Sequence, residues 1–530
     1  MSAAAGGAGR PPLIGSVRAA YLACVVVFGW AVTQFYFPAT GFTSLIEIGD
    51  AINERQTDAL RQTPHYVYEQ STGYDSAYYV QFSLDPLLRD PKLGEAIDNP
   101  QYRARRILFS WTAWLAGLGR PAWIVQAHAL LNVVCWLALA GLLLRWFPAT
   151  GWENFFRWFG VMFSHGLCMS VRDSLTDGPS LLLVALALAA WEDGRKGRGF
   201  VFLALAGLTR ETGLLAATAF APTDPRDRAG WKNWLLACAG AALPLLAWVI
   251  YLRWKFGLPT ETGLNNFTLP LAGLAEKWGA TVASLGDRSH SPSRWVTLAA
   301  TAGLTVQAVF FFLRWRPREL SWRVGATFVG LMATLATPVW EGLPGAAGRA
   351  LLPMTLAFNL AVPRGRRWLA VLIAGNLTVA AAYKEFSPPT EFFTLRAPSE
   401  LATAVAIERT GDWYGPEDGG GIRWRWSAGH AGLRVQNNSG HALTLLCSGH
   451  AAPALDERRL RISAGEAMVW SGELDVQPAE FQFGVVLPPG ETTLTFSTDK
   501  PAHPIGTDER TMAFKIYNVD LVVKPAPGAR

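Results

Sequence analysis

The stretch from Gly73 to Arg106 concentrates residues suited to acid–base chemistry and to phosphate binding. It reads GYDSAYYVQFSLDPLLRDPKLGEAIDNPQYRARR and is rich in aspartate, arginine and tyrosine, although it lies between two long apolar runs. A carboxylate can accept a proton from a hydroxyl group, and an arginine binds phosphate in a bidentate manner without losing its charge. This combination beside a membrane indicates chemistry on a lipid-linked phosphate.

Asp75 is the candidate general base in this stretch, with Tyr74 and Tyr78 as neighbouring candidates for substrate contact. A carboxylate just beyond the first apolar run is placed to take the proton of an acceptor sugar hydroxyl. The alternative is that Asp75 caps a helix, since aspartate often precedes a first helical turn. Asp98, followed by Asn99 and Pro100, indicates first a turn or a cap and second a substrate contact.

Basic side chains near the same apolar boundaries are candidate phosphate ligands. Arg103, Arg105 and Arg106 form one cluster, and Arg349 lies near the start of a later apolar segment, shortly after Glu341. Arginine is suited to phosphate because its planar guanidinium donates two parallel hydrogen bonds. The alternative for these arginines is contact with lipid headgroups or snorkelling to the interface.

Two further groups of ionisable residues interrupt apolar sequence. Arg172, Asp173 and Asp177 lie where the third apolar segment ends and the fourth begins, so either a substrate contact or a simple cap or salt bridge explains them. Arg210 and Glu211 lie within an apolar stretch, where ionisable groups are costly and usually line a cavity. The alternative is that these two side chains neutralise each other.

Several classes of chemistry lack support in the sequence. No P-loop, Rossmann glycine pattern, hydrolase elbow or metal-ligand spacing is present, so we expect no cofactor and no metal. The net charge is +6, and the basic residues lie in short clusters between apolar runs. This arrangement is typical of membrane topology signals and not of a nucleic-acid-binding surface.

The composition predicts a polytopic membrane protein. Charged residues are only 17% of the chain and apolar residues 50%, with 23 Trp and 28 Phe. A bilayer core takes about 20 apolar residues of helix. We expect about nine spans of this kind, near residues 18–36, 122–144, 155–171, 178–192, 234–252, 295–313, 322–338, 349–362 and 368–383.

Lysine and arginine clusters in the short loops set the expected orientation, with the N-terminus in the cytoplasm. All clusters can be cytoplasmic only if residues 199–222 enter and leave the membrane on one face. We therefore predict a re-entrant hairpin with Arg210 and Glu211 near its tip; the alternative is one ordinary span. This topology makes residues 37–121 a large outer loop with short helices, and it places the segments 171–178, 253–294 and 338–348 outside as well.

From about Pro388 onward the hydrophobic period changes to two, as in Phe481, Phe483, Val485 and Leu487. Short strands with turn signals in about 130 residues predict an antiparallel β-sandwich. We expect two domains, an all-α membrane module over residues 1–390 and an extracytoplasmic all-β sandwich over 395–530.

Three motifs together resemble GT-C superfamily glycosyltransferases, polytopic enzymes that use polyprenyl-phosphate sugars as donors. They are GYDSAYY at 73–79, DNPQYRARRI at 98–107 and LTRE at 208–211, and they are similar to motifs of bacterial members in the same order. The resemblance covers roughly residues 15–385. Ser76 and Ala77 replace a Gly-Gln pair of the usual pattern. The β-rich tail resembles the carbohydrate-binding sandwiches appended to such enzymes.

The resemblance implies an inverting transfer to an acceptor hydroxyl on the outer face of a bacterial inner membrane. Asp75 would be the catalytic base, and Arg103, Arg105, Arg106, Arg210 and Arg349 would hold the donor phosphate. The acceptor would be a glycan, a lipid or a protein, and membrane lipid would surround the helices. Two alternatives stay open: a transporter or flippase of lipid-linked glycans, and a non-enzymatic scaffold whose β domain binds glycans.

Overall fold

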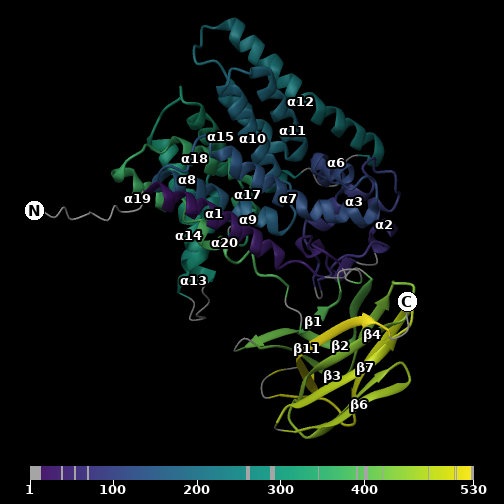
Figure 1. Ribbon diagram of the computed structural model, residues 1–530. Coiled ribbons are helices and arrows are strands. Elements are labelled where there is room, and N and C mark those ends of the chain that lie inside the picture. Colours follow the sequence, from purple (N-terminus) through teal and green to yellow (C-terminus); the bar gives the residue numbers. More distant parts are fainter. Residues whose placement is uncertain are drawn as a thin grey trace, which may run out of the picture.

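The computed structural model shows a helical domain followed by a β domain (Figure 1). Because the helical domain holds the candidate site, its arrangement decides which charged residues meet. The structure describes residues 13–526 except 38–39, 53–54, 69–70, 258–262, 287–292, 344, 390–391, 399–400, 402–403, 420–421, 476, 506–507 and 509.

The helical domain begins with a long apolar helix, a group of short helices and then a bundle. The first half comprises α1 (Leu13–Thr33), α2 (Asp58–Arg61), α3 (Ser76–Leu84), α4 (Leu93–Ala96), α5 (Pro100–Arg103), α6 (Ile107–Ala116), α7 (Pro121–Leu143), α8 (Trp152–Met162), α9 (His165–Arg172) and α10 (Asp177–Glu192). The second half comprises α11 (Lys196–Thr209), α12 (Arg228–Phe256), α13 (Ala272–Leu285), α14 (Ser293–Leu313), α15 (Leu320–Thr334), α16 (Thr337–Trp340), α17 (Gly345–Ala350), α18 (Leu352–Ala361), α19 (Arg366–Gly375) and α20 (Val379–Ala382). The 3₁₀ turns are η1 (Thr43–Leu45), η2 (Asp50–Ile52), η3 (Ala104–Arg106), η4 (Glu211–Phe220) and η5 (Leu264–Asn266).

Within the described residues, four helices are long and apolar enough to cross a membrane, and not the expected nine. They are Gly15–Thr33, Pro121–Leu143, Arg228–Phe256 and Arg294–Leu313. The other five apolar segments form helices of 16 residues or fewer or are broken into pairs, as where α8 ends and α9 begins around Ser164. One of these helices lies in the interior for most of its length: α18 buries its first eight residues, from Leu352 to Asn359. Nine apolar segments therefore correspond to only four single described helices of membrane-spanning length, because the other five segments are shorter or broken.

The described part of the segment 37–121 forms several short helices, α2 to α6. Helices α3 and α6 pack side by side, and the aromatic residues Tyr79 and Phe82 are buried with Trp248 of α12 in one cluster. The indole of Trp248 also donates to the carbonyl of Ala104, 2.7 Å away. These contacts fix the start of α3 and the turn η3 against a long helix, and both carry candidate site residues.

Residues 196–220 form a hairpin. Helix α11 ends at Thr209, Arg210 after it has an extended backbone, and η4 then returns along α11. The antiparallel direction follows from two contacts: Gly207 lies against Leu214 near the turn, and the rings of Phe200 and Phe220 meet farther away, 5.6 Å apart. Arg210 and Glu211 lie at the tip, as the sequence predicts, although the returning arm is a 3₁₀ and not an α-helix.

The β domain contains β1 (Phe393–Arg396), β2 (Val405–Gly419), β3 (Ile422–Asn437), β4 (Leu443–Pro453), β5 (Arg458–Ala464), β6 (Ala467–Leu474), β7 (Ala479–Leu487), β8 (Gly490–Thr498), β9 (His503–Pro504), β10 (Thr511–Met512) and β11 (Phe514–Pro525). Its nine-stranded sheet runs β6-β5-β8-β3-β11-β4-β7, with β1 beside β11 and β2 beside β3. All pairs are antiparallel except β1 with β11.

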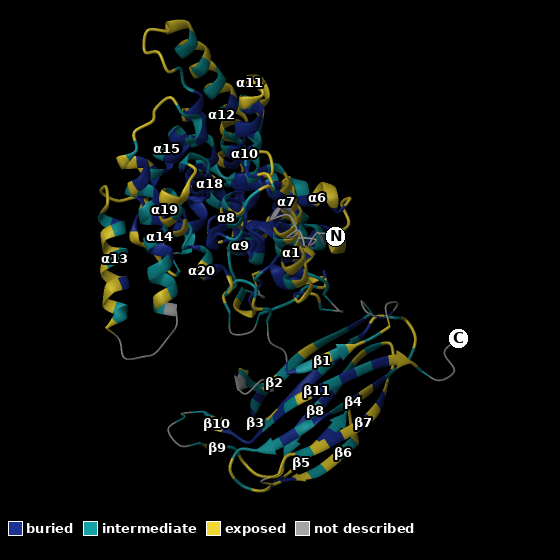
Figure 2. Ribbon diagram, turned by 60° about the vertical axis from the view of Figure 1, so that its left-hand side comes forward, coloured by how far each residue is buried: buried dark blue, intermediate teal, exposed yellow. Residues whose placement is uncertain are grey.

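The sheet curls around its own core and is nearly closed (Figure 2). Its end strands β6 and β7 approach each other, and the rings of Trp470 and Phe481 are 5.9 Å apart. Burial alternates along β7 in the expected manner, with Phe481, Phe483, Val485 and Leu487 facing inward. The expected β-sandwich is formed by one continuous sheet that curls back on itself, since β3 and β11 each pair on both sides.

Candidate active site

Charged residues from five separate elements meet at one end of the helical domain. They come from the start of α3, from α5 with η3, from the first turn of α10, from the hairpin tip and from α17. Most of the residues singled out in the sequence belong to this group: Tyr74, Asp75, Tyr78, Asp98, Arg103, Arg106, Asp177, Arg210, Glu211 and Arg349.

Asp75 forms an ion pair with Arg103. The distance from Arg103 Nη1 to Asp75 Oδ1 is 2.6 Å, and Arg103 also binds Asp98 through Nε and Nη2 at 3.1 and 2.8 Å. The guanidinium lies over the ring of Tyr78, 5.0 Å from its centroid. Asp75 occupies the N-cap position of α3 but its side chain makes no capping bond, whereas Asn99 accepts from the Tyr102 amide and caps α5. The capping interpretation therefore suits Asn99 and not the Asp75 carboxylate.

Arg106 joins helix α3 to the hairpin tip. Its Nε donates to Glu211 Oε2 at 3.1 Å, and its Nη1 donates to the hydroxyl of Tyr79 at 2.9 Å. Tyr102 also receives a bond from Arg106 Nη2, and Arg105 stacks over the Tyr102 ring, 5.4 Å from its centroid. Glu211 thus pairs with an arginine from a distant segment and not with Arg210.

Asp177, the first residue of α10, holds two arginines at once. Arg210 Nη1 binds its Oδ1, and Arg349 Nη1 binds its Oδ2 at 3.2 Å. Arg349 further donates from Nη2 to the hydroxyl of Tyr74, 2.8 Å away. One buried carboxylate therefore ties together α10, the hairpin and α17, and links them to the residue that precedes Asp75.

A second group of charges borders the first. Arg172 donates to the hydroxyl of Tyr68 at 2.9 Å and contacts Asp173 at 3.4 Å. Burial raises the pKa of Asp173 to about 7; Arg172 opposes this effect, and the carboxylates of Glu47 and Glu385 add to it. Asp173 therefore carries a proton for part of the time near neutral pH.

Exposure separates residues that can meet a ligand from residues that hold the others in place. The side chains of Asp75 and Glu211 are 22% and 26% exposed, and that of Arg103 is 17% exposed. Those of Asp177 and Arg349 are only 1% and 4% exposed. The open side of the group consequently presents Asp75, Glu211 and Arg103, while Asp177 and Arg349 lie behind them.

The electrostatic surroundings keep Asp75 ionised. Burial on its own acts to raise the pKa of this carboxyl group, but Arg103, Arg349 and Arg106 outweigh it and hold the pKa below its usual range. A carboxylate that keeps its charge can accept a proton or attract a cationic transition state throughout the neutral range.

Two tyrosines, Tyr79 and Tyr102, belong to the network although the sequence did not mark them as candidates. Glu341, a candidate from the sequence, lies outside the network. Glu341 is exposed beyond the end of α16. Tyr79 and Tyr102 bind Arg106. The sequence could have indicated both tyrosines, because they lie in the two motifs that also contain Asp75 and Arg103. In the described part of the chain, no group of three or more His, Cys, Asp or Glu side chains is placed to hold a metal ion.

Comparison with known proteins gives a distant structural likeness. No protein-family model and no curated protein matches the chain. Among solved structures, it is similar to the arabinosyltransferase EmbB from Mycobacterium smegmatis, determined by cryo-electron microscopy, with 10% sequence identity and a TM-score of 0.27. The alignment covers 79% of this chain and 59% of that one. A likeness at this level does not establish a shared fold.

Proposed function

We propose that the chain is a membrane glycosyltransferase that moves a sugar from a polyprenyl-phosphate donor to an acceptor hydroxyl. The observation that carries the proposal is a partly exposed, ionised Asp75 beside Arg103, with Arg106, Arg210 and Arg349 gathered behind it. Such a group supplies a base and stabilises a developing phosphate charge at the same place. Among the described residues, four helices are long and apolar enough to cross a membrane, and they supply the setting that a lipid-linked donor needs.

In the proposed reaction, Asp75 takes the proton of the acceptor hydroxyl as that oxygen attacks the anomeric carbon. The bond from the anomeric carbon to the phosphate oxygen breaks, and its electron pair leaves with the polyprenyl phosphate. Arg103, which is partly exposed, and Arg210 at the hairpin tip stabilise this leaving group by charge-assisted hydrogen bonds. A single displacement inverts the anomeric centre.

The remaining residues act as positioning groups in this proposal. Asp177 orients Arg210 and Arg349, and Arg349 orients Tyr74 next to the base. Asp173 and Asp177 are poorer candidates for the base because their side chains are 7% and 1% exposed. The reaction takes place on the outer face of a bacterial plasma membrane, with the N-terminus in the cytoplasm and the β domain outside. The acceptor is a glycan, a lipid or a protein.

The test is transfer of radiolabelled sugar from a panel of polyprenyl-phosphate donors by purified protein in detergent. Asp75→Asn should lose about 10²-fold or more of the transfer rate, which is the usual contribution of a general base. Asp98→Asn is the matched control, because Asp98 binds the same arginine but is more exposed. Both variants should keep donor binding.

Three outcomes would count against the proposal. Equal transfer by wild type and Asp75→Asn would remove Asp75 as the base. Equal loss in Asp75→Asn and Asp98→Asn would show that both act only through Arg103. Donor movement across liposomes without transfer, in wild type and Asp75→Asn alike, would identify a flippase.

A further inference from the structure

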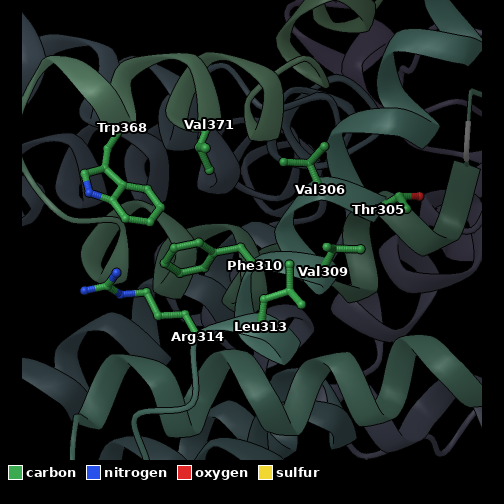
Figure 3. A pocket seen from close by; sticks show the side chains of 8 residues that line it. All are labelled: Thr305, Val306, Val309, Phe310, Leu313, Arg314, Trp368 and Val371. Carbon is green, nitrogen blue, oxygen red and sulfur yellow. The ribbon is translucent and has the colours of Figure 1, made fainter.

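An apolar cavity lies between α14 and α19, far from the charged group. It has a volume of about 380 Å³ and is lined mainly by aliphatic side chains and by Phe310 and Trp368. Figure 3 shows Arg314 and Trp368 at one end of this cavity and Thr305 at the other. Val309 and Leu313 are 46% and 76% exposed, so the cavity is open to the surroundings of a helix that is apolar enough to lie in a membrane.

A second, polar cavity adjoins the first at Arg314, which lines both. This cavity has a volume of about 400 Å³, and four arginines and one glutamate line it, together with Asn359, two aromatic residues and the apolar residues 360–363. Glu319 is paired with Arg316 at 2.9 Å, and Arg157 is bound to backbone carbonyls and Glu153. Arg314 lies over the Trp368 ring, 4.9 Å from its centroid, and no described carboxylate lies within ion-pair distance of it.

The two cavities lie at the opposite end of the bundle from Asp75. Trp146 lines the polar cavity and donates to Glu192 at the last turn of α10, 2.9 Å away. Asp177, in the charged group, is the first residue of the same 16-residue helix. At 1.5 Å per residue the two ends are about 24 Å apart. A lipid in these cavities would therefore not reach the proposed reaction site with its headgroup.

We infer that these joined cavities form a binding site for an anionic phospholipid of the surrounding bilayer. One acyl chain lies in the apolar cavity, and the phosphate meets Arg314 and the neighbouring arginines of the polar cavity. The assignment rests on charge complementarity: Arg314, which has no ion-pair partner among the described residues, lies at the mouth of an apolar groove and fits a ligand with a hydrocarbon chain and a phosphate. It does not depend on the proposed transferase activity.

The test is lipid binding to the full-length protein by native mass spectrometry. Phosphatidylglycerol and phosphatidylcholine with the same acyl chains are added to delipidated protein at equal concentrations. Wild type should retain phosphatidylglycerol preferentially. Arg314→Gln should bind it about tenfold more weakly, which corresponds to about 1.4 kcal/mol. Val309→Trp, which fills the exposed groove without changing charge, should weaken binding of both lipids.

Arg318→Gln is the matched control, because Arg318 is exposed in the same connection and lines neither cavity. It should bind phosphatidylglycerol as wild type does. Equal loss in the Arg314 and Arg318 variants, or equal retention of the two phospholipids by wild type, would overturn the inference. Displacement of phosphatidylglycerol by an equal concentration of polyprenyl phosphate would also overturn it and identify a donor-type lipid as the occupant. Size-exclusion profiles and melting temperatures of all variants would show that they are folded.

Discussion

Asp75 and Asp173 lie in adjoining parts of the same charge network but differ in proton affinity. The pKa of Asp75 is held below its usual range by three arginines, whereas burial raises the pKa of Asp173 to about 7. A base works in its ionised form, so a rate that depends on Asp75 stays constant as pH falls from 8 to about 5 and declines only near the ordinary carboxyl pKa of about 4 or below.

The pH dependence of transfer therefore identifies the base. We expect similar rates at pH 5.5 and 7.5 for donor-saturated wild type. A tenfold fall in rate for each pH unit below about 7 would instead indicate Asp173. Asp173→Asn is the control: it should remove any inflection near pH 7 and leave the profile set by Asp75 unchanged.

Asp177 and Asp98 both bind arginine, but their burial predicts very different effects on stability. Asp177→Asn leaves the buried guanidinium groups of Arg210 and Arg349 without their carboxylate partner. Removing one partner of a buried ion pair costs about 3–5 kcal/mol of stability. Asp98→Asn removes a half-exposed ion pair, which contributes about 1 kcal/mol or less. Thermal unfolding in detergent should show a clearly larger loss for Asp177→Asn, and equal losses would contradict the central role of Asp177.

The sequence predicted the members of the charge network better than their pairing. Asp75, Arg103, Arg106 and Arg210 were found from residue type and position beside apolar runs. Their ion-pair partners could not be predicted from the sequence. An ion pair between residues about a hundred positions apart, such as Arg106 with Glu211, depends on how the helices pack. For the same reason, Arg210 and Glu211 form their ion pairs with Asp177 and Arg106 and not with each other.

At the scale of elements, the close approach of α9 and α17 places Arg349. Gly166 in α9 faces the backbone of Gly348, and a Cβ at Gly166 would overlap the Gly348 carbonyl oxygen. Because backbone atoms cannot rotate away, Gly166→Ala must push α17 and Arg349 outward. We expect a loss of about 1–3 kcal/mol of stability and a reduced transfer rate.

Gly141→Ala in α7 is the matched control for this change. A Cβ there meets no atom within 4 Å, so the alanine should be neutral or stabilise the helix by about 0.5–1 kcal/mol. Thermal unfolding and transfer assays on both variants check the pair. Unchanged activity and stability in Gly166→Ala would show that α17 does not depend on this contact.

Element types were predictable where a local pattern decides them. The hairpin followed from loop charges and short apolar halves, and the strands followed from the alternation around Phe481. Helix length was not predictable in the same way, because α10, α15 and α18 are apolar but are only 16, 15 and 10 residues long. The breaks at Ser164 and Leu351 are also invisible to a measure that averages hydropathy.

At the scale of the whole molecule, the charged group and the β domain are separate. The residues that form the network, from Glu47 to Glu385, all belong to the helical domain, and the strands begin at Phe393. The β domain has its own apolar core, inside the curled sheet. A cavity of about 710 Å³ lies where the loop after α2 faces β2 and β3, so the β domain borders the outer loop without supplying the base or the arginines.

This division predicts the effect of removing the β domain. A chain that ends at residue 388 keeps every residue of the network, so it should still bind the polyprenyl-phosphate donor and transfer sugar to a small soluble acceptor. Arg103→Gln should weaken donor binding by the same factor in the shortened and the full chains, because Arg103 contacts only residues of the helical domain. Donor binding by both pairs of proteins can be measured by microscale thermophoresis after size-exclusion chromatography. Complete loss of donor binding in a monodisperse shortened chain with an unchanged melting temperature would favour a scaffold whose β domain binds the glycan.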